Sequence, residues 1–137
     1  ATGFYNTNYS GKVKATLAEL EKKDVVFLHI SAGEEVSLKG SIDDKIHIIE
    51  DFDSEVVKPM AQALETQQET KLLVVVNHVS SVSLMKYDRA PVPYLVYSSK
   101  TVNPTSGLNK YDEQILETGK SFNTAYALIE AFFSNKI

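Results

Sequence analysis

The chain has 137 residues, of which 43% are hydrophobic and 23% are charged, so it can bury a sizeable core. Its net charge of −4, with no dense cluster of Lys and Arg, argues against nucleic acid or an anionic membrane as a partner. The absence of Cys excludes disulfides and thiolate metal sites, and three histidines leave little material for a self-contained metal site. No apolar run approaches the roughly 18 residues that a membrane span needs. No signal peptide is visible at the start, and we expect a cytoplasmic protein.

The first part of the chain predicts a loop, a helix and a buried strand. Residues 1–9 are rich in Asn, Thr and Gly, and Ser10 is the expected cap of a helix over about 11–22. Residues 24–31, DVVFLHIS, are mostly β-branched and aromatic, which is typical of a buried and parallel strand. The polar segment over 32–41 is expected to be a loop, because two glycines in it signal turns.

The middle of the chain predicts one long helix and a second strand. Apolar residues recur at helical spacing over 42–67, Ser41 is a plausible cap, and Pro59 is expected to kink the helix. Residues 71–77, KLLVVVN, have the composition of another buried strand. A strand–helix–strand crossover nearly always joins parallel strands, so we expect 24–31 and 71–77 to be parallel.

The last part continues the alternation of strands and helices. It predicts a long connection over 78–91, a strand over 94–98, a polar loop over 99–110, and one or two helices of which the last covers about 122–134. The order of elements predicts an α/β fold with a layered, mainly parallel sheet flanked by helices. We expect residues 1–137 to form a single domain.

Polar residues follow two of the predicted strands, where α/β sheets bind ligands. Glu34 and Glu35 are candidate oxygen ligands or acid/base groups, or else parts of a solvated acidic loop. His78, beside Asn77, is a candidate ligand or a hydrogen-bonded loop residue. The sequence has no Gly-rich phosphate loop and no Ser in a nucleophile elbow, so it identifies no catalytic residue.

Three segments carry motifs of one known family. The opening ATGFYNTNYSGKVKATLAELEKKDVVFLHI is similar to a block ATGY-x-DTNY-x-GK, a helix, and a strand D-x-VFLH-[VI]. The segment KIHIIEDFDSEVVKPM is similar to K-x-x-x-IE-x-ID followed by VV-x-P-[LM], and SLMKYDRAPVPYLVY to SLRTHTADPVPFLIY. The chain thus resembles the archaeal-type cofactor-independent phosphoglycerate mutases of the alkaline-phosphatase superfamily. The resemblance implies that the chain is the C-terminal part of a larger alkaline-phosphatase-like fold.

The resemblance also implies a site for two divalent metals, Mn, Mg or Zn, with five ligand positions in this part of the chain. The family motif EAPDEAGH reads SAGEEVSL here, with Glu34 in the Asp position and Leu38 in the His position. The Asp and His of DHPTP correspond to Asn77 and His78, and the His of THTADPVP corresponds to Tyr87. Only one position is identical, so we expect a degenerate metal site at Glu34, Asn77, His78 and Tyr87, and no cofactor in this chain.

Three functions remain open. We expect a non-catalytic fragment or pseudoenzyme relative of the metal-dependent 2,3-bisphosphoglycerate-independent phosphoglycerate mutases. The first alternative is part of an active phosphoryl-transfer enzyme that interconverts 2- and 3-phosphoglycerate, completed by a missing N-terminal portion and with Glu35 and Asp88 as further ligands. The second is an anion- or phosphate-binding module that uses His78, Ser80 and Ser81. The expected partners are a second copy of the chain, in a homo-oligomer, or the missing N-terminal portion.

Overall fold

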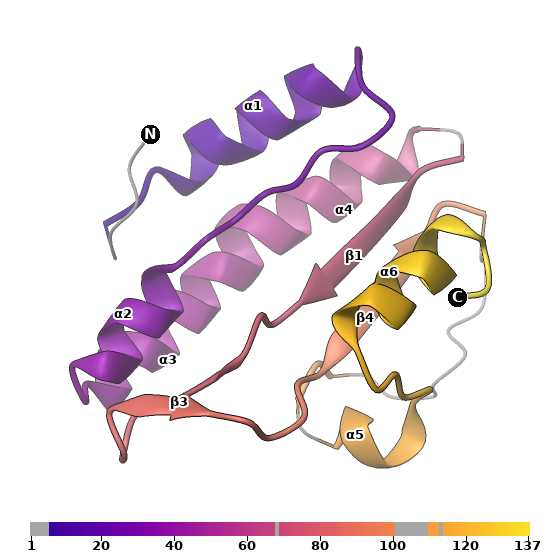
Figure 1. The fold of residues 1–137 in the computed structure, drawn as a ribbon. Helices are drawn as coiled ribbons and strands as arrows, with labels where there is room; N and C mark the ends of the chain where they lie inside the picture. Colours follow the sequence, from indigo (N-terminus) through magenta and orange to yellow (C-terminus); the bar gives the residue numbers. More distant parts are fainter. Residues whose placement is uncertain (1–5, 68, 101–109, 113) are drawn as a thin grey trace. The chain divides into compact units, whose positions relative to one another are not determined.

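The computed structural model describes residues 6–67, 69–100, 110–112 and 114–137. The chain divides into two compact units, which are described separately (Figure 1). Unit 1 contains Ala1–Gln67 and Ser80–Arg89, and unit 2 contains Gln68–Val79 and Ala90–Ile137. The loop predicted over 99–110 lies largely outside the described residues, as does most of the loop predicted over 1–9.

Unit 1 begins with α1 (Tyr9–Leu20), which confirms the first predicted helix. The expected cap at Ser10 is wrong, because Asn8 caps the helix: its Oδ1 accepts a hydrogen bond from the backbone N–H of Gly11 at 2.9 Å. Ser10 lies inside the first turn, and its hydroxyl donates to the same Asn8 oxygen at 3.3 Å. The short Asn side chain reaches the N–H three residues ahead, which is the geometry that a helix start requires.

The two predictions for residues 24–41 are both wrong. Residues 25–31 do not form a β-strand. A strand needs a ladder of hydrogen bonds, and no strand in the described ranges pairs with these residues. The expected loop over 32–41 is instead largely a helix, α2 (Ala32–Leu38). Its start has the sequence S-x-x-E at Ser31–Glu34, although the Ser31 side chain makes no capping hydrogen bond, and two glutamates in its first turn favour the positive end of the helix dipole. Gly40, at a φ of +75°, follows the helix end.

The long helix predicted over 42–67 is confirmed as three consecutive segments. They are α3 (Ile42–Phe52), a wide π-helical turn η1 (Asp53–Val57) and α4 (Lys58–Glu65). Ser41 is the cap, as predicted, and its side chain accepts a hydrogen bond from the N–H of Asp44 at 3.4 Å. The kink expected at Pro59 stays a prediction; directly before this residue the helix contains η1, in which the N–H of Lys58 bonds to the carbonyl of Asp53 five residues back. Proline has no N–H to continue the regular ladder.

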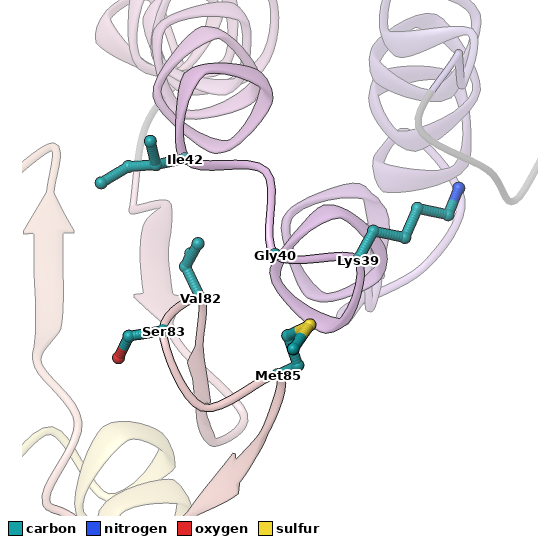
Figure 2. Close-up of a pocket in the computed structure, with 6 residues that line it drawn as sticks. All are labelled: Lys39, Gly40, Ile42, Val82, Ser83 and Met85. Atoms are coloured by element: carbon teal, nitrogen blue, oxygen red, sulfur yellow. The ribbon is translucent and has the colours of Figure 1, made fainter.

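A short hairpin interrupts the connection predicted over 78–91. Strand β2 (Val79–Ser81) pairs with β3 (Lys86–Asp88). The turn of this hairpin and the end of α2 line an open pocket (Figure 2), which is formed by Lys39, Gly40, Ile42, Val82, Ser83 and Met85. The pocket is shallow and mostly apolar, so it contributes no chemically distinctive group.

The core of unit 1 lies among its helices. Its most buried hydrophobic residues come from α1, α2, α3, η1 and α4, and they are Tyr9, Val13, Ala32, Val36, Ile48, Val56, Met60 and Leu64. Ile30 packs against the part of this core formed by Ala32, Val36 and Ile48. The extended segment before α2 is therefore fixed to the helices on one side.

Unit 2 is built on an antiparallel pair of strands, β1 (Lys71–Val75) and β4 (Tyr94–Ser98). Two helices follow, α5 (Ile115–Thr118) and α6 (Ala125–Phe133), and α6 is capped by the Thr124 hydroxyl, which accepts from the N–H of Ala127 at 3.2 Å. Both strands and the last helix were predicted from the sequence. The pairing was not, because β1 pairs antiparallel with β4 and not parallel with residues 24–31.

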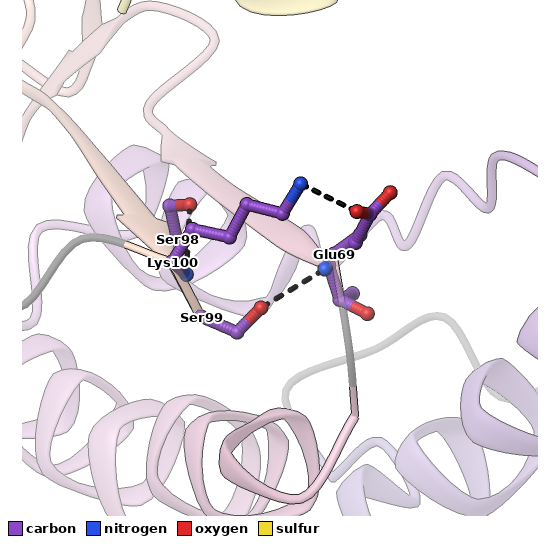
Figure 3. Close-up of polar contacts among 5 residues, drawn as sticks. Glu69, Ser98, Ser99 and Lys100 are labelled. Carbon is purple, nitrogen blue, oxygen red and sulfur yellow. Dashed lines mark hydrogen bonds and ion pairs between the residues drawn. The ribbon is translucent and has the colours of Figure 1, made fainter.

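Polar contacts close one end of this strand pair (Figure 3). The ammonium of Lys100 lies 2.6 Å from Oε1 of Glu69, and the N–H of Thr70 donates to the hydroxyl of Ser99 at 3.1 Å.

The described helices and strands make the chain an α/β protein, but a layered parallel sheet is not formed by the described residues. None of the described helices has the length and apolar character to span a membrane.

Candidate functional site

Two of the four expected metal positions lie together in unit 1. Glu34 is in the first turn of α2, and Tyr87 is the central residue of β3. The phenol of Tyr87 donates a hydrogen bond to Oε1 of Glu34 at 2.5 Å, although the two residues are 53 positions apart in the chain. The contact links β3 to α2. It also occupies one oxygen of the carboxylate with a neutral donor.

The pair has a clear electrostatic consequence. The hydrogen bond to Glu34 raises the pKa of Tyr87 above its ordinary value of 10.0, and desolvation and the negative charge of Glu34 add to the shift. The phenol therefore remains protonated at neutral pH. A protonated phenol is a donor to the carboxylate, whereas tyrosinate would be needed for strong metal ligation.

A second contact holds the other strand of the hairpin. The ammonium of Lys45 in α3 donates to the backbone oxygen of Ser80 at 2.7 Å, and Ser80 itself is buried. Sequence reasoning did not identify Lys45, because a lysine within a predicted helix carries no signal of its long-range partner. The hairpin is thus attached to α2 through β3 and to α3 through β2.

The other two expected positions, Asn77 and His78, belong to unit 2 and follow β1, as the sequence predicted. Their side chains contact each other, with Nδ2 of Asn77 3.1 Å from Nδ1 of His78. When the imidazole is neutral and protonated at Nε2, the amide donates to Nδ1. In that tautomer neither ring nitrogen offers a lone pair to a metal.

The donor atoms present do not fit a site for two divalent cations. Such sites are built from several carboxylates and imidazoles, whereas these positions supply one carboxylate, one neutral amide, one imidazole and one phenol. Leu38, in the remaining ligand position implied by the resemblance, offers no donor atom. Within the ranges that the structure describes, no three or more His, Asp or Glu side chains are grouped so that they could hold a metal ion.

Glu35, the other acidic candidate, has a local role. It lies in the first turn of α2, where its Oε1 accepts a hydrogen bond of 3.5 Å from the hydroxyl of Ser31. A carboxylate at this place favours the helix dipole. The acidic pair is therefore part of a helix start and not of a solvated loop.

Comparison with known proteins identifies the class to which this fold and these motifs belong. Residues 2–132 match the Metalloenzyme superfamily, so the chain belongs to this superfamily. It is 36% identical over 120 residues to the 2,3-bisphosphoglycerate-independent phosphoglycerate mutase of Methanosarcina acetivorans. It is 38% identical over 114 residues to the probable enzyme of that name from Geobacter sulfurreducens. The resemblance seen in the sequence motifs is thereby confirmed.

The likeness extends over most of this chain but over a minor part of each relative. The two matches cover 87% and 83% of this chain, and 30% and 28% of the respective relatives. The chain thus spans less than a third of the length of these curated relatives. A solved structure of a protein from Pyrococcus horikoshii shares the fold, with a TM-score of 0.75 and 24% identity over 87% of this chain and 35% of that one.

Proposed function

We propose that this chain is a non-catalytic relative of the metal-dependent 2,3-bisphosphoglycerate-independent phosphoglycerate mutases and represents the C-terminal part of their larger fold. The observation that carries the proposal is the hydrogen bond from Tyr87 to Glu34. By the resemblance, these two residues stand at positions where the family has metal ligands. Here they bind each other.

The hydrogen bond competes with any metal ion that binds Oε1 of Glu34. A divalent cation that binds both carboxylate oxygens of Glu34 would have to displace the phenol, or remove its proton against the raised pKa of Tyr87. Displacement of the phenol adds no ligand, deprotonation adds one phenolate in place of the imidazole of the family, and Leu38 supplies no lone pair. The loss of several ligands lowers affinity much more than the roughly 10–100-fold effect of changes around the ligands.

The chemistry of unit 2 supports the same conclusion. Asn77 supplies a neutral amide where the family motif has a carboxylate, and its contact with His78 uses one nitrogen of the ring. A dinuclear site needs anionic ligands to offset the charge of two cations. We therefore propose that this chain binds no metal. Its net charge of −4 also argues against nucleic acid or an anionic membrane as a partner. The partner that we propose is the remainder of the fold.

Metal titration tests the proposal directly. Calorimetry of the chain with Mn²⁺ and Zn²⁺ should detect no micromolar binding, and an assay of 2- and 3-phosphoglycerate interconversion should detect no turnover. A variant that restores the ligand types, Leu38→His/Asn77→Asp/Tyr87→His, should gain metal binding. The matched control Leu84→His, at an exposed position in the hairpin turn, should not.

A contrary result would favour the alternative, an active enzyme completed by another portion of the protein. Micromolar binding of Mn²⁺ or Zn²⁺ to the unaltered chain, lost in His78→Ala, would contradict the proposal. So would mutase turnover by a longer gene product that contains this sequence and loses activity in Glu34→Gln.

A further inference from the structure

Residues 25–30 run as an extended segment between α1 and α2, and their side chains alternate between two faces (Figure 1). On the outer face, Val25 is 57% exposed and Phe27 is 83% exposed. The opposite face is half-buried and consists of Val26, Leu28 and Ile30. This alternation is the period of a β-strand that packs on its own protein by one face only.

The backbone of this segment lacks the partners that a strand requires. Within the described ranges, no backbone–backbone hydrogen bond involves residues 25–30. The contact made by their backbone is with a side chain, because the ammonium of Lys12 donates to the carbonyl of His29 at 3.4 Å. In a strand, the backbone groups of successive residues point to opposite edges. Both edges of the segment are therefore open to pairing with another strand.

The composition of the segment is that of a strand inside a sheet. Residues 25–30 contain no Asp, Glu, Lys, Arg or Pro, although natural edge strands are protected from pairing by charges and prolines. The outer face carries Val25 and Phe27, whereas a strand with one solvated face has polar residues there. The rings of Phe27 and His29 also lie 6.5 Å apart and nearly parallel, with an interplanar angle of 7°. The outer face is thus an apolar surface suited to burial.

The rest of the same polypeptide meets these requirements better than a second copy of the chain. A two-fold pair of copies adds one strand at one edge and leaves the other edge open. The curated relatives are long enough to supply more, because this chain spans less than a third of their length. This step rests on the proposed function, by which the remainder of the fold is the partner of the chain.

We propose that residues 25–30 are an interior strand of a β-sheet that is completed by the rest of the polypeptide. Strands from that portion pair with the two open edges through backbone hydrogen bonds. Their own residues are mainly β-branched and aromatic, as in this segment, and side chains of the same portion cover Val25 and Phe27. The segment is therefore the place where this chain joins the remainder of the fold.

Hydrogen exchange resolved to single residues tests the pairing in the full-length product of the gene. The amides of residues 25–30 should exchange at least about 100-fold more slowly there than in this chain alone. All six should be protected, because successive amides bond to strands at opposite edges. Strand β1 is the internal control, since its pairing with β4 protects it in both proteins.

Substitution at Phe27 tests the covered outer face separately from the folding of unit 1. Phe27→Asp should leave the urea midpoint of this chain alone unchanged, because the side chain is 83% exposed there. In the full-length product the same change should speed the exchange of residues 25–30 at least about tenfold, since it buries an unpaired charge. Phe27→Ile should keep the protection. Tyr126→Asp, at a residue of α6 that is 77% exposed, is the matched control and should keep it too.

Three results would overturn the proposal. The first is a folded full-length product in which residues 25–30 exchange as fast as in this chain, or are protected at alternate residues only. The second is protection in this chain alone together with a dimer in light scattering, which would assign the edge to a second copy. The third is a gene that encodes no portion beyond this chain. Metal binding or mutase turnover by the full-length product would instead contradict the proposed non-catalytic role and leave the pairing of residues 25–30 unaffected.

Discussion

Lys45 in α3 reaches the backbone oxygen of Ser80 in β2, with 2.7 Å between its ammonium nitrogen and that oxygen. This bond and the one between Tyr87 and Glu34 attach the two strands of one hairpin to two consecutive helices of unit 1. Both partners of the first bond are at least partly buried, whereas the second bond lies at the surface. The two bonds should therefore respond differently to mutation.

Replacement of Lys45 by methionine should lower the free energy of unfolding by about 1–3 kcal/mol, because it leaves the oxygen of a buried residue without its charged donor. Urea unfolding followed by circular dichroism would measure the loss. Lys14→Met is the matched control, since Lys14 is exposed on α1. Equal stability of the two variants would show that the Lys45 bond does not hold the hairpin.

The Tyr87–Glu34 bond predicts a pH dependence at the alkaline side. Because the hydrogen bond raises the pKa of Tyr87 in the folded chain, its contribution to stability is complete below the ordinary value of 10.0. It is lost as the pH rises through the higher folded pKa. Phenolate absorbance can be titrated in the parent chain and in Tyr87→Phe. The difference between the two curves gives the titration of Tyr87 alone among the seven tyrosines. In Glu34→Gln the pKa should move back towards 10.0.

Tyr111 predicts a wider alkaline window in unit 2. Burial raises the pKa of Tyr111 from 10.0 to about 12, and its hydroxyl donates to the carbonyl of Pro93 at 2.7 Å. Its contribution to stability should be complete below about pH 10 and disappear as the pH approaches about 12. Melting temperatures across this range should fall less steeply in Tyr111→Phe. The control Tyr126→Phe, at a residue that is 77% exposed, should behave as the parent chain.

Two adjacent isoleucines in α3 provide an internal comparison of core and surface. Ile48 is 6% exposed and packs with Ala32 and Val36, whereas Ile49 is 56% exposed. Ile48→Ala should cost about 2–5 kcal/mol, because it removes apolar contacts and leaves a cavity. Ile49→Ala should change stability by less than about 0.5 kcal/mol. A large loss at Ile49 in denaturant unfolding would mean that this face of α3 is covered in solution.

Local patterns of residues predicted most of the elements. The helical spacing over 42–67, the cap at Ser41, and the apolar runs of β1 and β4 are all properties of neighbouring residues. Helix α2 was also predictable in principle from the spacing of Ser31 and Glu34. It was missed because two glycines in a polar segment are typical of a loop.

The errors in the sheet and in the candidate site concern contacts between residues distant in the chain. The run over 24–31 has strand composition, but composition does not provide a partner, and the antiparallel pairing of β1 with β4 cannot be read from either strand alone. The same holds for the candidate site. The motif comparison identified the positions of Glu34 and Tyr87, but not that the phenol would donate to the carboxylate. A hydrogen bond across 53 residues leaves no local signal.

The π-helical turn at Asp53–Val57 determines where the long helix tolerates a change in length. The buried residues Ile48 and Val56 are eight positions apart, and loss of one residue within the turn would bring them to seven, the spacing of one face of a regular helix. Met60 and Leu64 would keep their orientation. Deletion of Glu50, inside α3, would instead rotate Met60 and Leu64 by about 100° about the helix axis relative to the preceding turns. Natural length variation in this helix should therefore be confined to the wide turn.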